Sequence, residues 1–173
     1  MELMDVIYKR RSVRLYTGVD IPEEKLDMII SAGLMAPTSR DLKPCEFYVV
    51  TNRDVLLELA GAKAAGGSFI KGAAAAIAVF ADAERADTWI EDSSIALSYM
   101  NLMAEEQGVG SCWVQIHLRK GADGSDAEAN CRRILDVPDN YRIVGILSLG
   151  MPSGEVKPHD PPEIDMNKVH FVR

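Results

Sequence analysis

Apolar side chains recur at helical spacing in several segments of the chain, and this periodicity predicts amphipathic helices. In one segment, Leu26, Ile29 and Leu34 form a stripe between Pro22, a favoured helix start, and Pro37, which stops the helix. The predicted helices cover residues 2–9, 22–35, 52–65, 87–107 and 125–135.

Short apolar runs between these helices predict strands. The run AAAAIAVFA, residues 73–81, is apolar on both faces and suits a strand buried within a sheet, although its alanines equally allow a helix. Strands that alternate with helices, without a repeat or a linker, indicate a single α/β or α+β sandwich domain over residues 1–173. The predicted strands cover residues 46–50, 73–81, 111–116 and 141–150.

The C-terminal segment, residues 151–173, holds four of the eight prolines and shows no periodic pattern. It ends in VHFV, residues 169–172, an apolar and strand-like piece. Such a segment is unusual for a compact monomer. We therefore expect it to reach across to a second subunit, as exchanged arms do in symmetric dimers.

Charge and composition narrow the classes of function. The formal net charge of −7 argues against nucleic-acid binding, because basic faces bind phosphate backbones. The longest apolar run is too short to span a bilayer and lacks signal-peptide flanks, so we expect a soluble, cytoplasmic protein with no membrane partner. Cys45, Cys112 and Cys131 show no CxxC spacing, which predicts neither a disulfide framework nor a metal site.

The stretch KRRSVR, residues 9–14, concentrates cations in this acidic chain. A solvated helix end explains it simply, because the helix dipole favours cations there. A phosphate site is the sharper alternative, since arginine forks grip phosphate in a bidentate manner and Ser12 adds a hydroxyl donor. The residues alone leave both interpretations open.

Two further segments have similar ambiguity. APTSRDLKP, residues 36–44, is either a polar connection or a loop whose donors read the polar edge of a planar heterocycle. GVGSCWVQI, residues 108–116, is either a helix stop before a core strand or a place where glycines let a ligand approach the backbone. The chain has no GxSxG elbow, and the spacing of His117, His159 and His170 suggests no triad. If the chain is an enzyme, a cofactor therefore carries the chemistry.

The order of these segments resembles the FMN-dependent nitroreductase family over essentially the whole chain. The segments are RRSVRLY, then IPEEKLDMIISAGLMAPTSRDLKPCEF, AIAVFAD, DSSIALSYMNLMAEEQGVGSCWVQI and finally VGILSLGMPSGEVKP. The resemblance implies an α+β sandwich with a central, mostly antiparallel sheet and helices on both faces. It also implies an intertwined homodimer with FMN at the subunit interface, in which residues 151–173 are exchanged.

The resemblance further implies roles for particular residues. The basic segment 10–14 would hold the flavin phosphate and ribityl chain, and the loop 37–43 would lie along the flavin. The strand residues 114–116 would approach flavin N5 through the backbone. Lys157, after the turn at 150–152, would complete the phosphate site, with His159 as a weaker candidate. The implied cofactor-binding residues are Arg10, Arg11, Ser12, Arg14, Pro37, Thr38, Ser39, Arg40, Asp41, Lys43, Val114, Gln115, Ile116 and Lys157.

The implied activity is that of an FMN-dependent NAD(P)H oxidoreductase. It would pass hydride from NADH or NADPH through flavin N5 to a nitroaromatic, quinone or enone, with no protein side chain assigned as catalytic. A flavin-binding or redox-sensing protein without turnover is an alternative, as is a different flavin reaction such as dehydrogenation or flavin fragmentation. Asp41 stands where the family loop commonly has asparagine, and either Lys43 or Arg40 can offset its charge by pairing with it or by facing the flavin.

Overall fold

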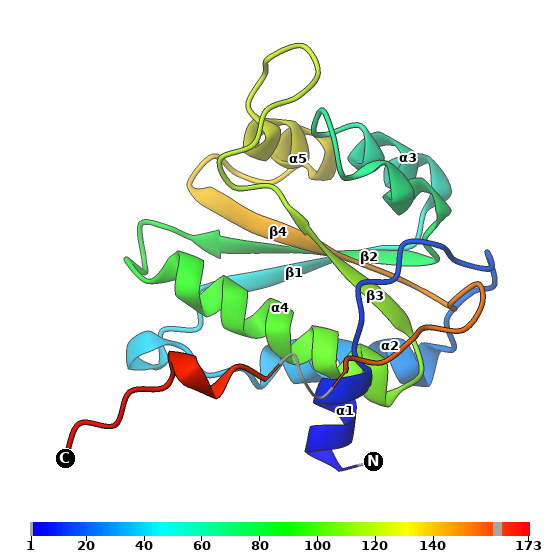
Figure 1. Ribbon diagram of the computed structural model, residues 1–173. Helices are drawn as coiled ribbons and strands as arrows, with labels where there is room; N and C mark the ends of the chain where they lie inside the picture. Colours follow the sequence, from blue (N-terminus) through cyan, green and yellow to red (C-terminus); the bar gives the residue numbers. More distant parts are fainter. Residues whose placement is uncertain (1, 161–163) are drawn as a thin grey trace.

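The computed structural model, which describes residues 2–160 and 164–173, is built on a four-stranded sheet with the strand order β1-β2-β4-β3 (Figure 1). All three strand pairs are antiparallel. The sheet confirms the predicted α+β sandwich and its antiparallel centre. The strands are β1 (Cys45–Val50), β2 (Ala75–Asp82), β3 (Gly110–Gln115) and β4 (Tyr141–Gly150).

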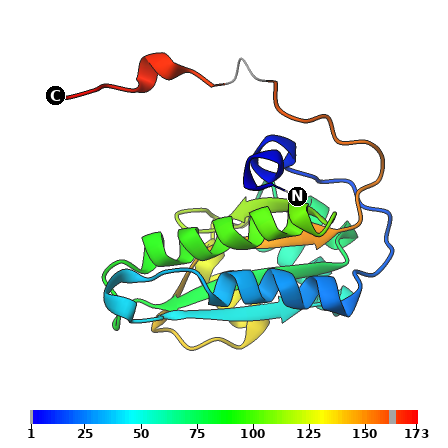
Figure 2. The same ribbon diagram turned by 90° about the horizontal axis from the view of Figure 1, so that it is seen from below.

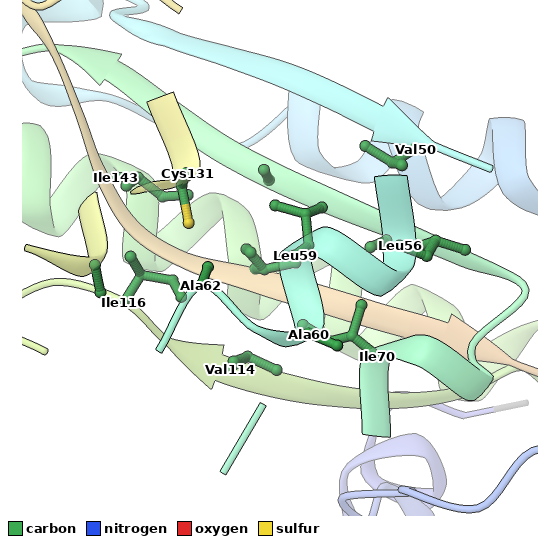
Figure 3. Close-up of a cluster of buried hydrophobic side chains, with 14 of the residues drawn as sticks. Val50, Leu56, Leu59, Ala60, Ala62, Ile70, Val114, Ile116, Cys131 and Ile143 are labelled. Atoms are coloured by element: carbon green, nitrogen blue, oxygen red, sulfur yellow. The ribbon is translucent and has the colours of Figure 1, made fainter. Parts of the chain in front are cut away.

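Helices cover both faces of this sheet. On one face, α2 (Glu23–Leu34) and α4 (Trp89–Glu106) pack on each other and on the sheet, and α1 (Leu3–Lys9) contacts α4 (Figures 1 and 2). On the other face lie α3 (Arg53–Ala60) and α5 (Ala127–Leu135). Figure 3 shows the core under α3, where Leu56, Leu59 and Ile70 are fully or almost fully buried. Truncating Leu56 to alanine should cost about 2–5 kcal/mol of folding free energy.

The alanine-rich run becomes the central strand β2, as the burial of both its faces required. Ala76 and Ala78 face the core under α3, while Ile77 and Val79 face α2 and α4. Gly33 allows α2 to approach this second core closely. A Cβ there would lie 2.9 Å from the Sδ atom of Met100 and 2.9 Å from the ring of Phe47.

Two sequence predictions fail locally. The helix predicted over 52–65 ends at Ala60, because Gly61 caps it and the chain then bonds to distant partners. Ala64 N–H donates to the Lys120 carbonyl at 2.9 Å, and Asn130 Nδ2 donates to the Ala62 carbonyl at 3.0 Å. The other failure is VHFV, which forms no strand in the single chain and is exposed.

The C-terminal segment leaves the body of the molecule (Figure 2). Its described end, residues 164–173, contains a short 3-10 helix at Met166–Lys168 and exposes Phe171 and Val172. Part of the predicted exchanged arm, residues 161–163, lies outside the described residues. None of the helices within the described ranges is long and apolar enough to cross a membrane.

Candidate functional site

The segment that follows α1 runs along the free edge of β3. Val13 N–H donates to the Ser111 carbonyl at 2.9 Å, and Ser12 forms a parallel bridge with Ser111. Gly110 makes this close approach possible, because a Cβ there would lie 2.8 Å from the Cγ1 atom of Val13. The basic segment is therefore extended along a strand rather than solvated as one more helical turn.

The chain after β4 returns beside this segment. Ser153 N–H donates to the Leu15 carbonyl at 3.0 Å, and Thr17 N–H donates to the Met151 carbonyl at 2.9 Å. A cavity of about 400 Å³ opens between the two stretches. Its lining includes Arg11, Ser12, Arg14, Ser153, Glu155 and Lys157.

Four residues that the family resemblance assigned to one phosphate site thus line one cavity. Two guanidinium groups, an ammonium group and a hydroxyl can offer donors to an anion there, which fits a phosphate. Burial raises the pKa of the Cys112 thiol, next to this site, and the charge of Arg14 opposes that effect. Arg14 also stacks over the Phe69 ring, with its Cζ atom 5.7 Å from the centroid.

Arg10 and His159 occupy different positions from the four residues that line the cavity. Arg10 ends α1 as its C-cap and is not part of the cavity lining. Its charge acts on Glu105 of α4, whose pKa is raised by burial and lowered in part by Lys9 and Arg10. His159 lies beside Arg11, with its Nδ1 atom 3.0 Å from Arg11 Nη1, and it ties the C-terminal segment to the end of α1.

Gln115 is the last residue of β3, and its backbone N–H and C=O point away from the sheet. β3 has a strand neighbour on one side only, and backbone groups alternate in direction along such an edge strand. The carbonyl of Ser111 accepts a hydrogen bond on the outer side, so Gln115, four residues later, also points its N–H and C=O outwards. The next residue, Ile116, instead points its N–H towards β4, where it donates to the Val144 carbonyl at 2.9 Å.

Of the three strand residues implied to approach a flavin through the backbone, only Gln115 can therefore do so in this conformation. Val114 and Ile116 are buried in the core under α3. Val114 pairs with Ile146 of β4, while Ile116 donates its N–H to the Val144 carbonyl and accepts from Arg119 N–H at its own carbonyl. The side chain of Gln115 is held in place as well. Its Oε1 atom accepts a hydrogen bond from Trp113 Nε1 at 3.0 Å, and its Nε2 atom donates to the His117 carbonyl at 3.3 Å.

The loop after α2 is shaped by its own side chains. Lys43 N–H donates to Thr38 Oγ1 at 3.0 Å, and Ser39 N–H donates at 2.9 Å to Oδ1 of the buried Asp92. Arg40, Asp41 and Lys43 have positive φ angles, which are uncommon for residues other than glycine. Such backbone strain is often found at functional sites, where the surrounding structure maintains it.

The structure shows which residue pairs with Asp41 within the single chain. Lys43 Nζ lies 3.4 Å from Asp41 Oδ1, whereas Arg40 forms an ion pair with Asp87. Lys43 is therefore the residue that pairs with Asp41. Arg40 pairs with Asp87, which the sequence analysis did not consider. Pro37 is exposed at the start of the loop.

The loop 37–43 and the two stretches that line the basic cavity, residues 11–15 and 152–157, lie far apart within one chain (Figure 1). The loop leads directly into β1, which forms one edge of the sheet, and the cavity lies along β3 at the other edge. One chain therefore does not bring all the predicted site residues together.

The model of the nitroreductase family matches residues 7–66 and 58–151. The chain belongs to the nitroreductase family. The resemblance drawn from the sequence is thereby confirmed.

Relatives of this nitroreductase-family chain extend over most of its length. An FMN-dependent nitroreductase from Clostridium difficile R20291 is 42% identical, with a TM-score of 0.95, and the match covers 98% of this chain and 99% of that one. A protein of Archaeoglobus fulgidus with the provisional name NADH dehydrogenase/NAD(P)H nitroreductase is 32% identical over 89% of this chain and 87% of its own. The NADPH-flavin oxidoreductase of Vibrio harveyi is 28% identical over 97% of this chain and 74% of its own.

The sequence analysis does not predict Lys63, which contacts a residue of the candidate site. Lys63 Nζ donates to the outward carbonyl of Gln115 at 2.9 Å. Lys63 was placed inside a predicted helix, and the signal that could have found it is the glycine-rich break around it, GAKAAGG at residues 61–67. In residues 2–160 and 164–173, no group of three or more His, Cys, Asp or Glu side chains is arranged to hold a metal ion.

Proposed function

We propose that this chain is an FMN-dependent NAD(P)H oxidoreductase whose acceptor is a nitroaromatic, a quinone or an enone. The observation that carries the proposal is one continuous edge of the molecule. There the anion-binding cavity formed by Arg11, Ser12, Arg14 and Lys157 adjoins β3, whose last residue, Gln115, has an outward backbone N–H. FMN has a phosphate at one end and a ring nitrogen acceptor at the other, which suits this pairing of features.

The residues present fit the cofactor. The cavity residues would hold the phosphate, and Gln115 N–H would donate to the ring at N5. When bound, FMN supplies the chemistry that carries hydride between the nicotinamide and the acceptor. The contribution of the chain is to position the two ligands in succession and to set the electrostatics around the ring.

We further propose that the active form is a homodimer with FMN at the subunit interface. The loop 37–43 and the basic cavity lie at opposite edges of the sheet, so a second subunit would have to bring its loop to the first subunit's cavity. An apolar cavity of about 450 Å³ between α1, α2 and α4 supports this arrangement. It is lined by Leu3, Val6, Ala32, Tyr99, Leu102 and Met103, among others.

The exposed end of the chain supports an exchanged arm. Ile164, Met166 and Phe171 expose 54%, 61% and 74% of their surface, respectively. Burying side chains of this kind contributes roughly 1.5–3 kcal/mol each. A partner subunit that covers them would gain a substantial part of its binding energy from the C-terminal segment.

The test is an FMN titration of the purified apoprotein, followed by turnover assays with NADH and with NADPH. We expect one FMN per chain and acceptor reduction that depends on both FMN and a nicotinamide. FMN binding without turnover by either donor would favour the alternative of a flavin-binding or redox-sensing protein. Failure to bind FMN would refute the proposal.

A further inference from the structure

Lys63 is held firmly against the outer side of β3. The backbone on both sides of it is anchored, through the Ala62 carbonyl to Asn130 and through Ala64 N–H to the Lys120 carbonyl. Its aliphatic stem packs against the turn that follows, where a Cβ on Gly67 would lie 3.5 Å from Lys63 Cγ. Its ammonium group ends 2.9 Å from the Gln115 carbonyl oxygen.

Ladder geometry relates Lys63 to any ligand that Gln115 binds. On an added antiparallel strand, the N–H and C=O of one edge residue bond to the C=O and N–H of a single residue. Lys63 Nζ already occupies the donor position of that absent residue. An acceptor bound by Gln115 N–H would take the position of that residue's carbonyl oxygen. Its distance from Lys63 Nζ would then be similar to the distance between the N–H and C=O groups of one residue.

The charge of Lys63 is available to act on such a ligand. Within the described ranges, no carboxylate forms an ion pair with Lys63, whereas Arg40 and Lys43 are paired with Asp87 and Asp41. Burial lowers the pKa of Lys63 below its ordinary value, and Arg119 lowers it further. A partly desolvated cation is weakly screened, so its field acts strongly on a neighbouring group.

We propose that Lys63 is a positioning residue that fixes Gln115 and holds a positive charge beside the reacting edge of the flavin, and so raises the reduction potential of bound FMN. This inference rests on the proposed function. The cation that sets the potential of the flavin would then be Lys63, in the turn after α3, and not Arg40 or Lys43 of the loop 37–43.

The experiment compares the midpoint potential of FMN bound to the wild type and to Lys63→Met, measured anaerobically against reference dyes. A positive charge beside the ring favours reduced FMN over oxidised FMN. We expect the variant to bind reduced FMN about tenfold less tightly relative to oxidised FMN, which lowers the potential by about 30 mV for a two-electron couple. Lys63→Arg and the control Lys71→Met, at an exposed position, should stay near the wild-type potential.

Each outcome is decisive. An unchanged potential in Lys63→Met would overturn the inference, even if FMN affinity or thermal stability fell, because those losses would show a merely structural role. If Lys63→Met does not fold, Lys63→Gln keeps a donor for the Gln115 carbonyl without the charge and should show the same lowered potential. A wild-type chain that binds no FMN would overturn the proposed function itself, whereas bound FMN with an unchanged potential would overturn only the role of Lys63.

Discussion

Lys157 offers a sharp test of the phosphate cavity, because it lines the cavity while contributing little to folding. Its side chain is exposed, and no hydrogen bond or ion pair involves it among the residues that the structure describes. Lys157→Ala should therefore change the free energy of unfolding by no more than about 0.5 kcal/mol. Any larger effect on the cofactor must come from lost binding.

The expected loss follows from the chemistry of one charged donor. A hydrogen bond to a charged group contributes about 1.5–3 kcal/mol. At about 1.4 kcal/mol for each factor of ten, this corresponds to a loss of roughly 10- to 150-fold in affinity for FMN. Because Lys157 is exposed, solvent screens its charge, and we expect a value near the lower end of this range.

Riboflavin, which lacks the phosphate, makes the assay specific. Fluorescence titrations with both ligands should show an affinity loss of about tenfold for FMN and none for riboflavin in Lys157→Ala. Arg133→Ala is the matched control, since it removes one exposed positive charge from α5, outside the cavity. Equal losses for the two ligands, or unchanged FMN affinity, would refute the assignment of this cavity to phosphate.

Three further outcomes are expected. Deleting residues 164–173 should shift the dimer towards monomer by at least tenfold in sedimentation experiments, and an equally stable dimer would contradict the exchanged arm. Glu128→Gln should cost about 1–3 kcal/mol in chemical denaturation at neutral pH, because the buried carboxylate that accepts from the partly exposed Arg142 at 2.8 and 2.9 Å is replaced by a neutral group. Burial alone would raise the pKa of Glu128, but hydrogen bonds from Arg142 and His117 lower it overall, so this stabilisation should be fully present above the ordinary glutamate pKa and disappear as the pH falls through the lowered one. Burial, with a contribution from Glu128, raises the pKa of Cys131 to about 12, so iodoacetamide should modify this thiol at pH 8 only after unfolding, and rapid labelling of the native protein would show the packing to be wrong.

Much of the fold could be predicted because it follows from local patterns. The stripe in α2 leaves one face to pack against a sheet, and the two apolar faces of β2 suit a strand inside that sheet, although its alanines also allow a helix. The end of α3 could not be predicted in this way. Alanine and lysine favour continued helix after Gly61, and the bonds that end it come from Lys120 and Asn130, which are distant in sequence.

The candidate site also has some features that the sequence predicts and others that depend on tertiary contacts. The family resemblance implies a common role for Arg11, Arg14 and Lys157, and all three line one cavity in the structure. The pairing of Arg40 with Asp87 and the contact of Lys63 with Gln115 depend on tertiary neighbours with no local signal. Sequence also could not show that the loop 37–43 stands at the opposite edge of the sheet from the cavity.

The proposed function requires that this chain binds FMN and that a nicotinamide passes electrons to the bound flavin. The most direct measurement is the absorption spectrum of the FMN-loaded protein during anaerobic addition of NADH or NADPH. We expect the bands of oxidised flavin to bleach with at least one of the two donors and to return when an acceptor is added. Bands that persist with both donors would contradict the proposed oxidoreductase activity, and a protein that takes up no FMN at all would contradict the cofactor assignment.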